Sequence, residues 1–182
     1  MTKASKSTFD DFRRVSDFFY RDFYKAVEKV GNNPVISTKN YKNALQKYVN
    51  LIDSGKIKGI ETPRKDAIYK YAKQTSRKIP KYIDATQYRS LSDDIKFYAN
   101  LAKKTEGFDI KVLTGFKSAL ETDLNLLTDN KYTKNLVSKV YKNNKKVTAE
   151  TLADISNKLK FANKVYAEGL QNSIIKDITS KQ

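Results

Sequence analysis

Apolar residues recur at intervals of three and four along most of this chain, and that spacing is typical of amphipathic α-helices. The first such stripe consists of Phe12, Val15, Phe19, Phe23, Val27 and Val30. Thr8 and Asp11 have the spacing of a capping box at its start, and Gly31-Asn-Asn-Pro34 ends the pattern. We therefore predict a helix from about residue 8 to residue 30.

The same spacing continues toward the C-terminus and is interrupted by residues that typically begin or end helices. It predicts further helices over residues 39–54, 63–79, 91–106, 109–127, 132–142 and 148–179. Residues 81–90 are compatible with either a short helix or a loop. The last helix would be about 45 Å long, which is enough to extend from the body or to pack against another subunit.

These elements predict an all-α fold, a bundle-like array of about six to seven helices with a long C-terminal helix. The chain has 182 residues and fits a single helical domain over residues 1–182 that buries a core of ordinary size. The linker Gly55-Lys-Ile-Lys-Gly59-Ile looks flexible and suggests a sub-boundary near residues 55–60. We find no repeat of fixed period along the chain.

The composition is strongly basic, with 36 Lys and Arg against 20 Asp and Glu and a formal net charge of +16. Such an excess creates a positive potential that attracts nucleic acid, acidic protein surfaces and anionic lipid. The alternative is a solubilising surface with a general bias toward Lys, Asn, Ile and Tyr. The N-terminus lacks the apolar core of a signal peptide, and no stretch approaches the ~18 apolar residues of a membrane helix. We expect no membrane span and a cytoplasmic or virion location.

The chain contains no Cys and no His, which excludes disulfides, Cys/His zinc sites and Ser-His or Cys-His nucleophile systems. Phosphate-binding glycine loops and hydrolase motifs are also missing. The acid pairs Asp10-Asp11 and Asp93-Asp94 lie at predicted helix starts, where interaction with the helix dipole explains them. We therefore predict a protein that is not an enzyme and uses no cofactor or metal.

A first run of cations without acidic neighbours lies between Asp66 and Asp84. It consists of Lys70, Lys73, Arg77, Lys78 and Lys81. Its spacing gathers most of these cations on the outer side of one helix, where they would bind phosphate without reading base sequence. Tyr69 and Tyr71 flank the run and would stack on the bases of a single strand. The alternative is that the cations are merely solvated and the tyrosines line the edge of the core.

A second run of cations has no acid before Glu150. It consists of Lys131, Lys134, Lys139, Lys142, Lys145 and Lys146. Lys139 lies apart from Lys131 and Lys134 at the helical angle, so the six side chains do not share one face. A basic elbow between two helices is predicted instead. Runs of like charge are often only solvated, and that is the alternative for this run.

The first predicted helix carries more aromatic residues than one stripe needs. Phe18, Tyr20 and Tyr24 point away from its apolar stripe and are candidate protein-interface residues. An apolar patch left exposed on this helix would be an interaction site. The alternative is a central core helix that is buried on more than one side.

Together these features favour a non-enzymatic basic helical subunit, binding or structural, of a nucleic-acid-containing assembly. A phage virion internal protein or head-tail connector protein is one example. The expected partners are the nucleic acid backbone or an acidic protein surface, together with other protein subunits. Two alternatives remain open, a free nucleic-acid-binding regulator that uses one helix in a groove, and an inhibitor of a nucleic-acid-handling enzyme.

Overall fold

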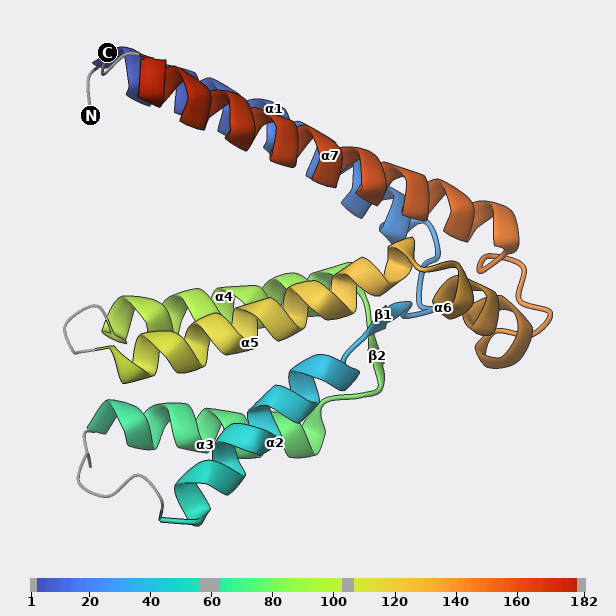
Figure 1. Ribbon diagram of the computed structural model, residues 1–182. Helices are drawn as coiled ribbons and strands as arrows, with labels where there is room; N and C mark the ends of the chain where they lie inside the picture. The colour runs from blue at the N-terminus through green and yellow to red at the C-terminus, as the bar shows by residue number, and fades with distance from the viewer. Residues whose placement is uncertain (1–2, 56–62, 103–106, 180–182) are drawn as a thin grey trace. The chain divides into compact units, whose positions relative to one another are not determined.

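The computed structural model describes residues 3–55, 63–102 and 107–179, and Figure 1 shows its elements along the chain. Within this part the elements are α1 (Lys3–Glu28), β1 (Ile36–Ser37), α2 (Lys39–Asp53), α3 (Pro63–Lys78), β2 (Tyr82–Ile83), α4 (Ala85–Ala102), α5 (Phe108–Asn125), α6 (Asn130–Asn135) and α7 (Ala149–Thr179). A 3-10 turn (Leu126–Thr128) follows α5, and a π-helical turn (Leu136–Val140) follows α6. The predicted all-α array of about six to seven helices with a long C-terminal helix is confirmed.

The chain divides into two compact units. Unit 1 combines residues 1–33 with residues 127–182, and unit 2 is the continuous segment of residues 34–126. The single domain over residues 1–182 stays a prediction, and the suggested sub-boundary near residues 55–60 falls on residues 56–62, which lie outside the described part. Unit 1 is therefore formed by two segments that are far apart in the sequence.

Unit 1 is built on α1 and α7, which lie side by side along their length (Figure 1). They run antiparallel, and the Tyr20 hydroxyl of α1 donates to Asn163 Oδ1 of α7 at 2.7 Å. The buried apolar side chains of these two helices are Phe23, Ala26, Val27, Leu152, Ile155, Leu159 and Ala162. The helix α1 begins at Lys3 rather than near Thr8. Residues 3–7 contain no Gly or Pro, so nothing in them prevents the helix from starting earlier.

Unit 2 contains the helices α2 to α5 and the short antiparallel ladder of β1 and β2. In the ladder Ile36 lies opposite Ile83. The helix α2 packs against both α3 and α5, and α4 packs against α5. The apolar core residues with at most 2% exposure are Val35, Ile36, Tyr41, Leu45, Ile68, Ala72, Ile83, Ala85, Ala102, Leu113, Phe116 and Leu120. Most of the helical members of this core occupy the apolar positions spaced by three and four.

The helix α4 begins at Ala85, six residues earlier than the spacing of Leu91 and the following apolar residues predicts. A capping box fixes this start. Asp84 Oδ1 accepts from the Gln87 backbone N–H at 2.7 Å, and Gln87 Oε1 accepts from the Asp84 backbone N–H at 2.9 Å. Residues 81–90 are therefore a strand followed by the first turns of a helix, and the second interpretation, a loop, is wrong.

Candidate functional site

The first predicted run of cations follows α3 to the strand β2. Lys70, Arg77, Lys78 and Lys81 are exposed, and Lys73 is half-buried. On the opposite side of α3, Ile68, Ala72 and Ser76 are buried. The 3.6-residue period thus directs the cations outward, because Lys70 and Arg77 lie two turns apart on the side that faces away from the core.

The two tyrosines beside this run are engaged within unit 2. The Tyr69 hydroxyl donates to Asp53 Oδ1 at 2.6 Å and accepts from Lys73 Nζ at 3.3 Å. The Lys73 ammonium also lies 5.5 Å from the centre of the Tyr69 ring. The half-buried Tyr71 packs its ring 5.0 Å from that of Tyr98. These contacts agree with the interpretation that both tyrosines line the edge of the core.

The second run belongs to unit 1, where all six of its lysines are exposed. They lie on α6, on the π-helical turn and in the segment that leads to α7. Tyr141 donates its backbone N–H to the Leu136 carbonyl at 2.8 Å, and this bond closes the π-helical turn while Leu136 is fully buried. We call residues 131–146 the basic elbow, as the sequence predicts a bend there.

The tip of the basic elbow has a fixed backbone. Asn143 is left-handed with φ of 61°, and Asn144 Oδ1 accepts from the backbone N–H groups of Lys146 and Val147 at 2.8 and 2.9 Å. Asn144 Nδ2 donates to Asn33 Oδ1 at 3.1 Å, which attaches the tip to the segment after α1. The elbow therefore presents its lysines from an ordered turn rather than from a free loop.

The eleven cations of the two runs make no ion pair with a carboxylate of the described residues. The ion pairs found in this part of the chain join neighbours on one helix, namely Asp93–Lys96, Lys117–Glu121, Asp154–Lys158 and Lys164–Glu168. An unpaired surface ammonium keeps its full charge for an external anion. The first run belongs to unit 2 and the second run to unit 1.

The net charge is distributed unevenly over the elements. The helices α1 and α7 together carry ten Lys and Arg and nine Asp and Glu. Nearly all of the +16 therefore lies outside these two helices. In unit 1 the excess is concentrated in the basic elbow, because its six lysines are accompanied only by Asp129 just before them. The Asp129 carboxylate is used locally, since it accepts from the Tyr132 backbone N–H at 3.0 Å and caps α6.

The three aromatic residues predicted at an interface occupy different environments. Phe18 is 65% exposed, whereas Tyr20 and Tyr24 are half-buried. Tyr20 is bonded to α7, and the Tyr24 ring packs 5.1 Å from that of Phe23. Val15, which the sequence places on the buried stripe, is 51% exposed, and this assignment is wrong because Val15 lies on the flank of the face that meets α7.

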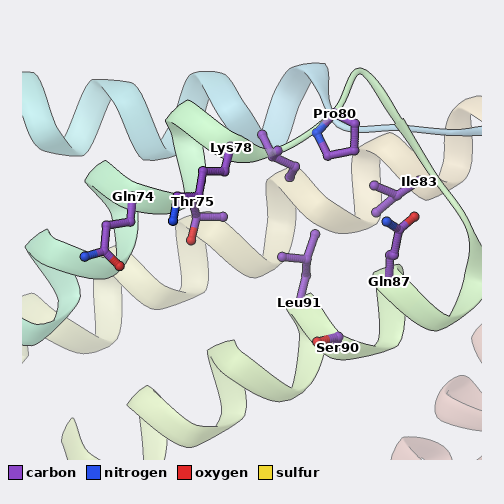
Figure 2. A pocket seen from close by; sticks show the side chains of 9 residues that line it. Gln74, Thr75, Lys78, Pro80, Ile83, Gln87, Ser90 and Leu91 are labelled. Carbon is purple, nitrogen blue, oxygen red and sulfur yellow. The ribbon is translucent and has the colours of Figure 1, made fainter.

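A pocket of about 330 Å³ lies between the end of α3, β2 and the start of α4 (Figure 2). Ile79, Ile83 and Leu91 supply apolar lining, and polar side chains such as Gln74 and Gln87 come from the two helices. Lys78, an exposed cation of the first run, is the charged residue of the lining. The sequence is ambiguous between helix and loop over residues 81–90, so it carries no signal for this pocket.

A polar cluster of the fully buried Tyr41 with the half-buried Tyr71 and Asp94 joins three helices of unit 2. The hydroxyls of Tyr41 in α2 and Tyr71 in α3 share a hydrogen bond of 2.7 Å, and Tyr71 is also hydrogen-bonded to Asp94 in α4. Burial raises the pKa of both tyrosines above the usual range of a phenol, so both hydroxyls stay protonated near neutral pH. Burial also raises the pKa of Asp94, and the hydrogen bond from Tyr71 opposes that rise. The cluster therefore ties helices together rather than supplying a phenolate nucleophile.

A fully buried carboxylate, Asp123 of α5, binds the N-terminus of α2. It accepts from the backbone N–H groups of Asn40 and Tyr41 and from Asn40 Nδ2. Burial raises the pKa of Asp123, and these hydrogen bonds oppose the rise. The hydroxyl of Thr38, the residue before α2, instead donates to the carbonyls of Pro80 and Lys81. Asp123 is thus a structural carboxylate whose acceptor sites are occupied within unit 2.

The cations of the two runs thus lie on ordered elements without carboxylate partners among the described residues, and the carboxylates of Asp94 and Asp123 are hydrogen-bonded within unit 2. Among the described residues no group of three or more Asp and Glu side chains is placed to hold a metal ion. No helix in the described part of the chain is both long and apolar enough to cross a membrane. Comparisons of this chain with protein-family models, with curated proteins and with solved structures found no match.

Proposed function

We propose that this protein is a non-enzymatic subunit of a nucleic-acid-containing assembly, and that it binds the nucleic acid backbone through its unpaired cations. The observation that carries the proposal is the absence of any ion pair between the eleven cations and the carboxylates of the described residues. Binding of these cations to phosphate would release the counterions condensed on the nucleic acid, and that release favours association. A virion internal or connector protein is one such subunit, with a cytoplasmic or virion location.

The basic elbow is the stronger of the two surfaces. Its six exposed lysines lie within residues 131–146, and the bonds of Asn144 hold the backbone that carries several of them. An ordered backbone lowers the conformational entropy that binding costs. Lysines contact phosphate as point charges and do not read base edges, so we expect binding that depends on salt and hardly on sequence.

The test is a salt titration of binding to labelled duplex DNA, single-stranded DNA and RNA of equal length. In an elbow variant Lys134, Lys139, Lys142 and Lys145 become Gln. We expect the slope of log affinity against log salt to become shallower by about 0.9 for each phosphate that is no longer bound on duplex DNA, and by about 0.7 on a single strand. A second variant with Gln at Lys70, Arg77, Lys78 and Lys81 measures the contribution of the first run.

A matched control replaces with Gln four lysines that already have carboxylate partners, namely Lys96, Lys117, Lys158 and Lys164. It changes the net charge by the same amount. If the elbow variant and the control weakened binding equally, the effect would be one of overall charge, which contradicts the proposal. Footprinting that revealed one protected sequence would instead favour the free regulator, and co-purification with a nucleic-acid-handling enzyme would favour the inhibitor.

A further inference from the structure

The side of α1 that faces away from α7 carries one continuous stripe of exposed residues. It consists of Asp11, Arg14, Phe18, Asp22 and Lys25, which are spaced by three and four. All five are exposed, and Phe18 is the most exposed large apolar side chain of the described residues at 65%. Residues with this spacing lie in a line along a helix, because 3.6 residues complete a turn.

The charges of this stripe are antisymmetric about Phe18. Arg14 lies four residues before Phe18, and Asp22 lies four residues after it. Asp11 lies seven residues before Phe18, and Lys25 lies seven residues after it. At each distance one side is therefore acidic and the other basic. None of these four side chains forms an ion pair with a described residue.

We propose that this stripe binds the same stripe of a second copy of the chain, antiparallel, about a two-fold axis at Phe18. In this register Phe18 meets Phe18 of the second copy, Arg14 meets Asp22, and Asp11 meets Lys25. A two-fold axis repeats each contact, so every ion pair occurs twice. Parallel docking would place each of these charges against its own kind, and the repulsion excludes that arrangement.

An apolar patch continues from the stripe onto α7. Phe18 packs edge to face on Phe19 with ring centres 5.4 Å apart, and Phe19 packs in the same way on Phe161 of α7 at 4.8 Å. Phe161 and Val15 are each 51% exposed. Burial of Phe18, the part of this patch that lies on the stripe itself, would provide the apolar contribution to association that surface ion pairs alone lack.

The charge distribution favours a second copy as the occupant. Two proteins of charge +16 repel each other over most of their surfaces. The helices α1 and α7 carry almost no net charge, so approach along α1 meets little of that repulsion. Because α7 covers the opposite side of α1, the order of helices across the dimer would be α7, α1, α1, α7. This inference names one protein partner of the proposed assembly and can be tested without nucleic acid.

The register is tested by disulfide cross-linking, for which the absence of native cysteine is an advantage. Arg14→Cys and Asp22→Cys variants are prepared separately, mixed and oxidised under mild conditions. We expect the mixed Arg14→Cys/Asp22→Cys dimer to exceed each homodimer by clearly more than the factor of about two that random pairing of an equal mixture gives, because only the antiparallel register brings these two positions together. A Lys160→Cys variant on the surface of α7 gives the background of random collisions. A mixed dimer that exceeds each homodimer by no more than this random factor, or cross-linking at the background level, overturns the proposal.

The contribution of charge is tested with variants in which the charges of Arg14 and Asp22 are reversed. Sedimentation velocity over a concentration series measures the dissociation constant of the dimer. Arg14→Asp and Asp22→Arg should each raise the dissociation constant about tenfold or more, because each brings two like-charge contacts into the dimer. The Arg14→Asp/Asp22→Arg double variant should restore the original constant. Lys160→Asp is the control for net charge, and circular dichroism verifies that each variant stays helical. A monomer at every concentration, or a double variant as weak as the single ones, overturns the proposal.

Discussion

The carboxylate of Asp123 in α5 accepts a hydrogen bond of 2.8 Å from the backbone N–H of Tyr41 in α2, so one helix caps the start of another. The cap comes from a residue 82 positions later in the sequence, and it is fully buried. The first N–H groups of a helix have no partner within that helix. Asp123 therefore accepts the backbone hydrogen bonds that a side chain at the N-terminus of α2 itself would usually accept.

Replacing Asp123 with Ala should lower the free energy of unfolding by about 2–4 kcal/mol, because the N–H groups of Asn40 and Tyr41 then have no acceptor. Urea denaturation monitored by circular dichroism measures the change. Asp129→Ala removes the exposed cap of α6 and serves as the comparison, with an expected decrease of about 1 kcal/mol. If both variants were destabilised by the same small amount, burial of the Asp123 cap would add nothing to its effect.

Asp94 should make the stability of the protein depend on pH. Burial raises the pKa of Asp94 above its usual range, so the folded protein binds this proton more tightly than the unfolded chain does. The free energy of unfolding should therefore fall as the pH rises from about 4 through the raised pKa, and it should stay at the lower value above that pKa. Asp94→Asn keeps an acceptor for Tyr71 but removes this titration.

The measurement is thermal unfolding of the parent protein and of Asp94→Asn at a series of pH values. The stability of Asp94→Asn relative to the parent should increase with pH across that window and then become constant. Asp123, whose pKa is also raised, is unchanged between the two proteins and cancels in the comparison. A difference that did not vary with pH would contradict the raised pKa of Asp94.

Gly31 and Gly115 should respond to Ala in opposite directions. Gly31 has a φ of +63°, which L-residues rarely adopt, and a Cβ there would lie 3.0 Å from Lys146 Nζ. Gly31→Ala should therefore destabilise the protein by about 1 kcal/mol or more. Gly115 lies within α5 and a Cβ there meets no atom within 4 Å, so Gly115→Ala should stabilise it by about 1 kcal/mol. Thermal unfolding of both variants measures the two changes in stability and their signs.

Asp84→Ala should remove the capping box of α4 and lower stability by about 1 kcal/mol. Because Gln87 lines the pocket and belongs to this cap, fraying of the first turn should also alter the pocket. Hydrogen exchange of the amides at residues 85–89 should become faster in the variant. Exchange at the parent rate would show that tertiary packing alone holds this turn.

The local part of the fold could be predicted from the sequence. The apolar spacing located the helices because a helix face is set by residues only three and four apart. Asp84 and Gln87 have the spacing of a capping box and so carry a local signal for the start of α4, whereas the apolar stripe that begins at Leu91 predicts a later start. The ion pairs Lys117–Glu121 and Lys164–Glu168 are likewise i,i+4 neighbours.

Other features depend on residues that are distant in the sequence. Nothing near Lys39 indicates that Asp123 will cap α2, and the exposure of Val15 depends on the rotation of α1 against α7. The outward direction of most of the first basic run followed from local spacing, whereas the absence of ion pairs from both runs required the folded positions of the acids. Binding of nucleic acid by these runs stays a prediction.

Unit 1 is assembled from two segments of the chain, with unit 2 inserted between them. During synthesis α1 therefore leaves the ribosome long before α7 exists, and Phe23 and Val27 stay uncovered until α7 has been translated. Unit 2 is continuous and has all of its residues available earlier. A nascent chain of this protein would depend on chaperones at α1 until α7 emerges, and a premature stop before α7 would leave that helix without its partner.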